Sequence, residues 1–260
     1  MAAYGEWIKG RRAPAAMRPP APGSGREPSA RIAAGGPVAL AVLGVGPRAA
    51  RCRRVDDGSL VAYRPADRVA LAPGTVVTVK ARVAAGRLEG EVIDTAVDAE
   101  ALGLEPLGLV ELAPGPPRRV RLAPLAPADA LEEAARLAEF GDPEGAIALA
   151  HAALDEDLRR LDAHAILGDI ALGADRVADA LAHYAVGAAI GDLSVPAEGA
   201  GELPWSEADN HAYLACLYGC ARALRRLGRE RDAAAPLARL LALDPDDGLG
   251  ASGLMRALQR

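Results

Sequence analysis

Hydrophobic and polar residues alternate along the chain with two different periods, and the first is the period of a β-strand. Between residues 75 and 83, valine and alanine occupy every second position and polar residues fill most of the positions between them. This alternation predicts a strand with one buried face. Asp57-Gly58 lies between two further β-prone runs and indicates a hairpin turn. We therefore expect about five short strands over residues 38–111, in a small antiparallel β-barrel of SH3-like or OB-like kind.

The second period is that of an amphipathic α-helix, and it dominates residues 128–260. Apolar residues recur there at spacings of three and four, and we expect the helices to end at the glycines that separate the runs. These glycines are Gly141, Gly173, Gly191 and Gly228. Asp142 followed by Pro143 is typical of a helix start, and Asp175 and Ser206 are further candidate N-caps. The predicted fold class is α+β, with a small barrel followed by an all-α domain.

Three stretches have neither period. Residues 1–37 are rich in Pro, Gly, Ala and Arg, and they predict a mobile basic tail because they cannot bury enough apolar surface to offset the entropy of ordering. Residues 112–127 are Pro-rich and basic, which is typical of an extended linker. Residues 192–210 contain several Pro and Gly residues and predict a loop inserted into the helical domain.

A repeated pattern runs through the helical half. Three segments share a Gly turn, a small Ala soon after it and an acidic end: GDPEGAIALAHAALDED, GADRVADALAHYAVGAAIGD and GRERDAAAPLARLLALDPDD. Ala146 and Ala180 lie 34 residues apart, and Ala233 follows Ala180 after the same interval plus an insertion of 19. The period and the helix-pair layout resemble the tetratricopeptide repeat, whose period is about 34 residues.

The resemblance assigns packing roles to particular residues. Leu167-Gly168 matches the Leu-Gly pair of the family's first helix, although Cys220-Ala221 stands there in the third unit. A small residue opens each second helix and a large one follows four positions later. The matching residues are Ala146, Ala180 and Ala233, then Tyr184 and Leu237, with Ala150 in the first unit. The family implies stacked helix pairs whose first helices line a concave groove that grips a partner segment.

One helix face is a candidate for that groove. Tyr218, Arg222, Arg225 and Arg229 follow one another at spacings that place them on one side of a helix. A tyrosine with a fork of arginines would suit an acidic peptide or a C-terminal carboxylate. The alternative is a solvated charged face with local ion pairs such as Arg226 with Glu230.

Two motifs that can carry chemistry have simpler structural explanations. Gly44-x-Gly46-x-x-Ala49 resembles a dinucleotide fingerprint, but the sequence leaves too few residues for the helix that must follow it. Cys216 and Cys220 are neighbours on one helix, but a zinc site would need two further ligands. We expect a strand followed by a turn at the first motif and buried small residues at the second.

No catalytic constellation emerges from the sequence. His151, His164 and His183 lack the spacing of a metalloprotease or a catalytic triad, and each is expected to make a local polar contact. The sequence therefore predicts a non-enzymatic adaptor or scaffold that binds another protein and needs no cofactor and no metal.

A nucleic-acid-associated protein that uses the barrel as an OB-like reader is the alternative function. Its cations would be Arg48, Arg51, Arg53 and Arg54, together with the basic tail. Such sites normally stack bases on aromatic side chains, and Tyr63 is the one aromatic residue between positions 38 and 111. The net charge of −5 also opposes binding to a phosphate backbone. We expect a protein partner instead.

The cysteine content and the length of the apolar runs indicate the cellular compartment of the protein. The three cysteines, at positions 52, 216 and 220, do not form a disulfide framework and indicate a reducing environment. The longest apolar run, residues 38–45, is far shorter than the roughly 20 residues of a membrane-spanning helix. We expect a soluble cytoplasmic protein without membrane contact. The preference for Arg over Lys, with much Ala, Gly and Pro, suggests a G+C-rich bacterial genome.

Overall fold

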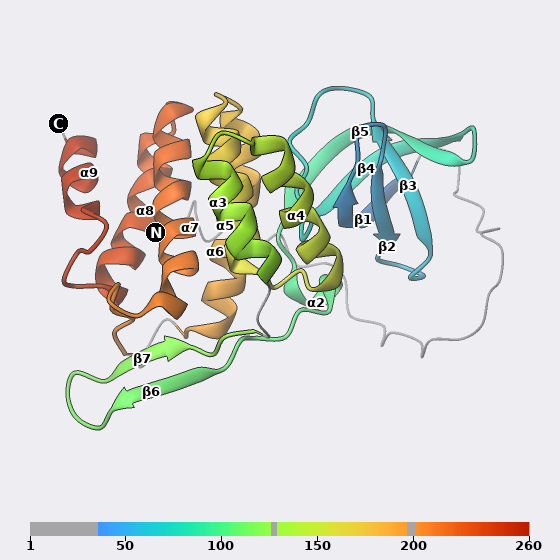
Figure 1. Ribbon diagram of the computed structural model, residues 1–260. Coiled ribbons are helices and arrows are strands. Elements are labelled where there is room, and N and C mark those ends of the chain that lie inside the picture. The colour runs from blue at the N-terminus through green and yellow to red at the C-terminus, as the bar shows by residue number, and fades with distance from the viewer. Residues whose placement is uncertain (1–35, 126–128, 197–200, 260) are drawn as a thin grey trace. The chain divides into compact units, whose positions relative to one another are not determined.

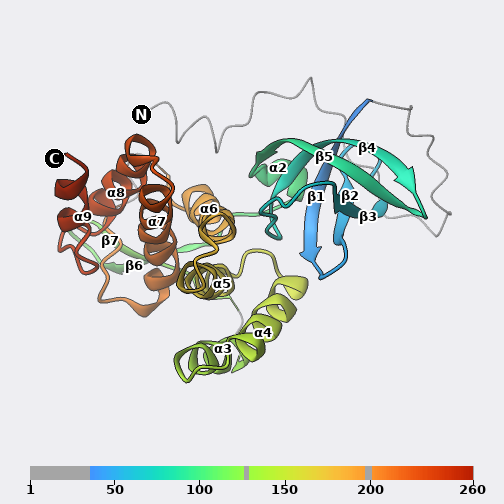
Figure 2. The ribbon, with the colours of Figure 1, turned by 90° about the horizontal axis from the view of Figure 1, so that it is seen from above.

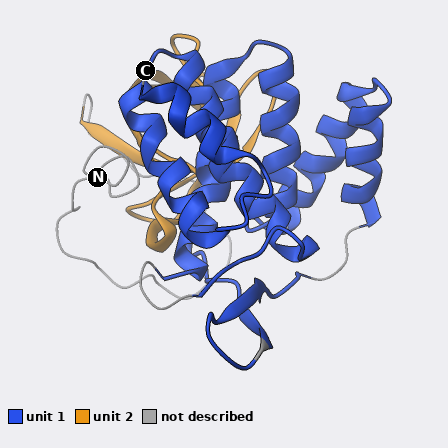
Figure 3. Cartoon of the chain, turned by 90° about the vertical axis from the view of Figure 1, so that its left-hand side faces the viewer, with its two compact units in different colours: residues 1–4, 103–260 blue, residues 5–102 orange. Residues whose placement is uncertain are grey.

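The computed structural model of the chain describes residues 36–125, 129–196 and 201–259. The described chain divides into two compact units, one ending at Leu102 and the other beginning at Gly103 (Figure 3). The division therefore precedes the predicted linker. The predicted basic tail lies outside the described residues, except for its last two positions.

The N-terminal unit, unit 2 of Figure 3, contains a closed five-stranded barrel (Figure 1). Its strands are β1 Pro37–Val45, β2 Ala50–Arg54, β3 Leu60–Pro65, β4 Val76–Ala84 and β5 Arg87–Ala96. They close in the order β1-β2-β3-β5-β4, in which β4, β1, β2 and β3 form a Greek key. A five-stranded Greek-key barrel is the architecture of the OB-fold, one of the two predicted kinds. The other strand pairs are antiparallel, as predicted, and only β3 and β5 pair in parallel.

The alternating apolar residues of the predicted strand lie in the core of the barrel. Val77, Val79 and Ala81 of β4 are buried, and they pack in one cluster with residues of the other four strands. Val83 was expected on the same face but is 63 % exposed, because it lies at the end of the strand next to the β4–β5 turn. Gly58, with φ +72°, forms the predicted β2–β3 turn. The turn at Gly46 follows β1, as expected, and leads into strand β2. The helix that a dinucleotide-binding motif would require there is not formed. The short helix α2 Ala99–Leu102 ends the unit.

The C-terminal unit, unit 1 of Figure 3, consists mainly of helices arranged in successive pairs (Figure 2). The helices are α3 Asp129–Glu139, α4 Pro143–Glu156, α5 Leu161–Gly173, α6 Val177–Ser194, α7 Ala208–Arg226, α8 Glu230–Leu243 and α9 Ala251–Leu258. The members of each pair, α3/α4, α5/α6 and α7/α8, pack against each other, and α5 also contacts both α3 and α7. The first helices thus form a row. The predicted fold class, a barrel followed by a helical domain, is confirmed.

One of the three predicted helix starts is correct. The Asp142 carboxylate accepts a hydrogen bond from the Gly145 N–H at 3.0 Å, and Pro143 is the first residue of α4. Asp175 instead has a left-handed conformation with φ +59°, and Arg176 is the N-cap of α6. Ser206 is also not a cap, because α7 begins after Glu207, which makes no side-chain capping bond.

The predicted stop at Gly191 is wrong, because α6 continues to Ser194. A methyl group at Gly191 would overlap the ring of Tyr213 from α7, so this glycine permits close packing and does not end the helix. The Tyr213 hydroxyl donates a hydrogen bond to Asp192, the residue after this glycine, at 2.6 Å. The predicted inserted loop over residues 192–210 is correspondingly shorter at both ends.

Tyr184 of α6 packs in the same way on a Gly-Asp pair of α5. A Cβ atom at Gly168 would lie 2.5 Å from the tyrosine ring, and one at Gly219 of α7 would also overlap it. The Tyr184 hydroxyl donates to Asp169 at 2.6 Å. We call this arrangement, a ring packed on glycine with its hydroxyl on the following aspartate, a glycine slot. The other packing positions suggested by the family resemblance are buried as well: Ala146, Ala180, Ala233, Leu167 and Leu237.

The predicted linker at residues 112–127 is largely a hairpin. Strands β6 Leu109–Ala113 and β7 Arg119–Leu122 pair in antiparallel fashion. On its other edge, β7 binds the inserted loop, because the Val120 N–H donates to the Glu202 carbonyl at 2.9 Å and the Glu202 N–H donates to the Arg118 carbonyl at 2.8 Å.

Asn210, in the first turn of α7, fixes this hairpin to the helices. Its side chain is fully buried, and its Oδ1 accepts from the Leu122 N–H at 3.0 Å. Its Nδ2 lies within donating distance of the Val120 and Pro204 carbonyls, at 3.3 and 3.1 Å. One side chain thus joins a strand, a loop and a helix.

We predict that Asn210→Ala lowers the free energy of unfolding by roughly 1–3 kcal/mol, because it leaves buried backbone groups without partners. Chemical denaturation measures the change, and faster tryptic cleavage at Arg118 would report loosening of the hairpin. Asp246→Ala is the control, since it removes an exposed ion pair with Arg119 and should change stability by less than about 1 kcal/mol. Equal effects of the two variants would contradict the role of Asn210.

Gly168→Ala should destabilise the chain by about 1–3 kcal/mol, because the buried Tyr184 ring has little room to move away from the added methyl group. Gly173→Ala, at the end of the same helix, is the matched control. A methyl group at Gly173 would meet no atom within 4 Å, and this change should leave stability equal or raise it by up to about 1 kcal/mol. Equilibrium unfolding in urea distinguishes the two variants. An unchanged free energy of unfolding in Gly168→Ala would contradict the tight packing of Tyr184 on Gly168.

Candidate functional site

Tyr218, Arg222 and Arg225, three of the four residues of the predicted binding face, lie on α7. The Arg222 guanidinium carbon lies 5.9 Å from the centroid of the Tyr218 ring, within the range of a cation–π contact. Tyr218 is half-buried, while Arg222 and Arg225 are exposed. We call Tyr218, Arg222 and Arg225 the α7 face. Neither arginine makes an ion pair with a carboxylate of the described residues.

Arg229 does not belong to this face. The helix ends at Arg226, and Gly228, with φ +72°, turns the chain away from the helix axis. Arg229 is the N-cap residue of α8, and its guanidinium pairs with Asp232 at 2.7 Å. The prediction was wrong here because it extended the helical spacing beyond a glycine that was itself expected to end the helix.

The local ion pair considered as the alternative is also not formed. Arg226 donates to the Leu172 carbonyl at 2.9 Å and to the Asp175 carboxylate at 2.6 Å, and so it ties α7 to the α5–α6 turn. Asp175 thus serves as an ion-pair partner although it is not a helix cap.

The glycine slot of Tyr184 lies beside the α7 face. Burial, followed by the charge and hydrogen bond of Asp169, raises the pKa of Tyr184 far above its usual range, and the nearby Arg222 opposes that rise. The phenol therefore stays protonated and holds Asp169, which is exposed on α5. Asp169 is thereby engaged by a neutral donor.

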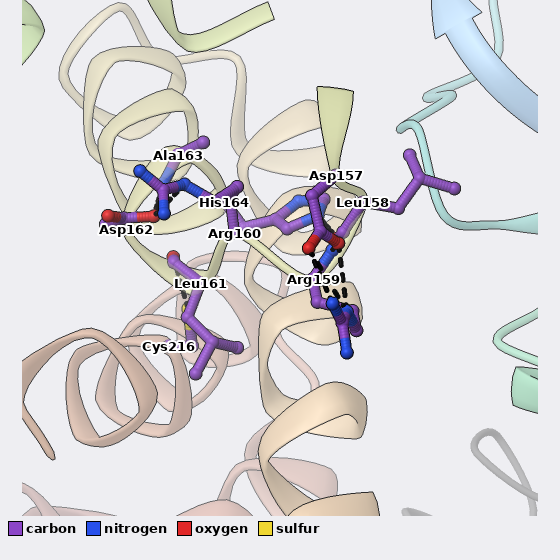
Figure 4. A network of polar contacts seen from close by, with 9 residues as sticks. All are labelled: Asp157, Leu158, Arg159, Arg160, Leu161, Asp162, Ala163, His164 and Cys216. Carbon is purple, nitrogen blue, oxygen red and sulfur yellow. Dashed lines mark hydrogen bonds and ion pairs between the residues drawn. The ribbon is translucent and has the colours of Figure 1, made fainter. Parts of the chain in front are cut away.

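A separate polar network orders the connection between α4 and α5 (Figure 4). Asp157 accepts hydrogen bonds from the Arg159 side chain, the shortest at 2.8 Å, and from the Arg159 backbone N–H. Burial opposes ionisation of Asp157, but these hydrogen bonds prevail and lower its pKa. Arg160 lies 3.7 Å from Asp162, and the Cys216 thiol lies 3.9 Å from the Leu161 carbonyl. These contacts fix the turn between α4 and α5.

The cysteines and histidines lie in the interior to different degrees. Cys52, Cys216 and Cys220 are free and buried, and burial raises the pKa of Cys52 to about 12. Among the described residues, no group of three or more His, Cys, Asp and Glu side chains is arranged to hold a metal. His151, His164 and His183 come from three helices and gather in one cluster, which the sequence did not predict.

No family model matches this chain, and no curated protein matches it. Within the described ranges, no helix is long and apolar enough to cross a membrane. The function must therefore be inferred from the site.

Proposed function

We propose that the helical unit is a non-enzymatic protein-binding module, an adaptor of tetratricopeptide-like kind that holds an acidic segment of a partner. The observation that carries the proposal is the α7 face, on which two exposed arginines and a tyrosine lie together and neither arginine is paired with a carboxylate of the described residues. Arginine binds carboxylates through paired hydrogen bonds, so this face is suited to an acidic peptide.

The arrangement of the helices supports this proposal. The first helices α3, α5 and α7 contact one another in a row, which provides a continuous surface along successive pairs. The glycine slots hold α5, α6 and α7 at close distance. A surface fixed in this way loses little conformational freedom when a segment binds, and this favours affinity.

The charge-reversal double variant Arg222→Glu with Arg225→Glu should weaken binding of an acidic segment by about tenfold or more, since hydrogen bonds to charged groups contribute about 1.5–3 kcal/mol. Fluorescence anisotropy with a labelled Glu/Asp-rich peptide measures the affinity, and a version with an amidated C-terminus tests whether the terminal carboxylate contributes.

The control is a second double variant with the same change in net charge, placed outside the α7 face. Arg231→Glu with Arg256→Glu alters exposed arginines of α8 and α9, outside the α7 face. Equal loss of affinity in both double variants would show that bulk charge, and not this face, attracts the peptide. Unchanged affinity in the α7 variant would exclude the proposal.

Nucleic-acid binding by the barrel is the second candidate, favoured by its OB-type strand order. Several observations weigh against it. Tyr63 is fully buried, Arg53 donates to the carbonyls of Ala101 and Leu102, and Arg54 is paired with Asp56. Of the four predicted arginines, Arg48 in the β1–β2 turn and Arg51 in β2 are exposed, and they are the cations that such a site would use. Absence of a salt-dependent mobility shift with single-stranded RNA would remove this candidate.

A further inference from the structure

The three clustered histidines join the first helix pair to the second. His151 lies on α4, His164 on α5 and His183 on α6. The ring centroid of His183 is 6.2 Å from that of His151 and 5.8 Å from that of His164. His164 is fully buried and His183 is 8 % exposed, whereas His151 is half-buried. The cluster thus extends from the interior towards the surface along α4.

Hydrogen bonding within the cluster fits neutral rings only. His164 Nε2 lies 3.2 Å from the Leu158 carbonyl and can donate to it. The Nδ1 atoms of His164 and His183 are buried and have no hydrogen-bond partner among the described residues. A protonated imidazole carries N–H groups on both nitrogens, so each charged ring would leave a buried donor without an acceptor. The cluster therefore cannot accommodate a proton in its closed form without cost.

The surroundings offer little compensation for a positive charge. Asp155, on the next turn of α4, favours the charged form of His151 only, and Arg176 at the start of α6 disfavours charge on His183. From α7, the Cys216 thiol reaches this part of the interior, but burial raises its pKa and keeps it neutral. Burial lowers the pKa of His164 to about 4 and that of His183 well below its ordinary value.

We propose that His151, His164 and His183 form an acid-operated latch, in which neutral rings hold α4 against α5 and α6 and protonation releases the first helix pair. The half-buried His151 provides the entry point for protons, and its charge then opposes uptake of a further proton by His164 and His183 while α4 stays packed. Opening the α4 contact would bring the imidazoles into water, where their charge is solvated.

The direction of the pH effect follows from proton linkage. The open form has histidines near their ordinary pKa of about 6.5, and the closed form binds protons only at lower pH. The closed form is therefore fully favoured above about pH 6.5, and it loses stability as the pH falls towards 4. Each proton taken up on opening increases the opening constant by about tenfold per pH unit, and two protons by about a hundredfold.

This latch acts on α3 and α4, not on the α7 face, and does not depend on the proposed binding function. Hydrogen–deuterium exchange of the full chain at pH 7.5 and pH 5.0, corrected for intrinsic exchange rates, tests it directly. We expect protection in α3 and α4 to fall at least tenfold at pH 5.0, while α7 and α8 keep theirs. Parallel loss in all helices, or no loss, would overturn the proposal.

Substitutions separate the cluster from general acid effects. His183→Leu removes one titrating ring and should reduce the pH dependence of α3–α4 opening by about tenfold per pH unit, whereas His211→Leu, outside the cluster, should leave it unchanged. His151→Gln, at a half-buried position, replaces His183→Leu if that variant does not fold, and it should also reduce the dependence. The same pH dependence in the wild type and in the cluster variant would contradict the latch.

Discussion

Close packing of Tyr184 against two glycines is the constraint on which the helical unit depends. Its ring fills the space between Gly168 of α5 and Gly219 of α7, where no side chain larger than hydrogen fits. The ring makes apolar contacts on both sides, and its hydroxyl donates a hydrogen bond to the exposed Asp169. The chain has few aromatic residues, and here the absence of side chains at both glycines lets the helices pack closely around one tyrosine ring.

A second glycine slot lies one helix later, between α6 and α7, the helix that carries the candidate site. Tyr213 packs on Gly191 and donates to Asp192, which also accepts from Arg239 at 3.1 Å. Burial raises the pKa of Asp192 although these hydrogen bonds favour its ionised form. The two slots fix the packing of α5, α6 and α7. In each slot a tyrosine hydroxyl donates a hydrogen bond to an aspartate carboxylate. Arg222 and Arg225 of the α7 face make no ion pair with a carboxylate of the described residues, which suits the proposed binding of an acidic segment.

Periodicity predicted most of the fold, but not the contacts between distant segments. The alternation at Val77 and Val79 and the stops at Gly141, Gly173 and Gly228 indicated the barrel and the helices correctly. Gly191 was misinterpreted because a glycine can end a helix or admit a neighbouring ring, and the partner that decides is remote in sequence. The β6–β7 hairpin was missed because proline content outweighed the alternation in the sequence RVRL at residues 119–122. The histidine cluster required three-dimensional proximity that spacing does not encode.

Peptide binding by Tyr184→Phe tests most directly whether the slot prepares the α7 face. The phenylalanine ring fills the slot but cannot hold Asp169, and the freed carboxylate then competes for the nearby Arg222. We predict severalfold weaker binding of the acidic peptide, with a loss of unfolding free energy of only about 1–2 kcal/mol. Unchanged affinity in a variant with that loss of stability would contradict the link between the slot and the site.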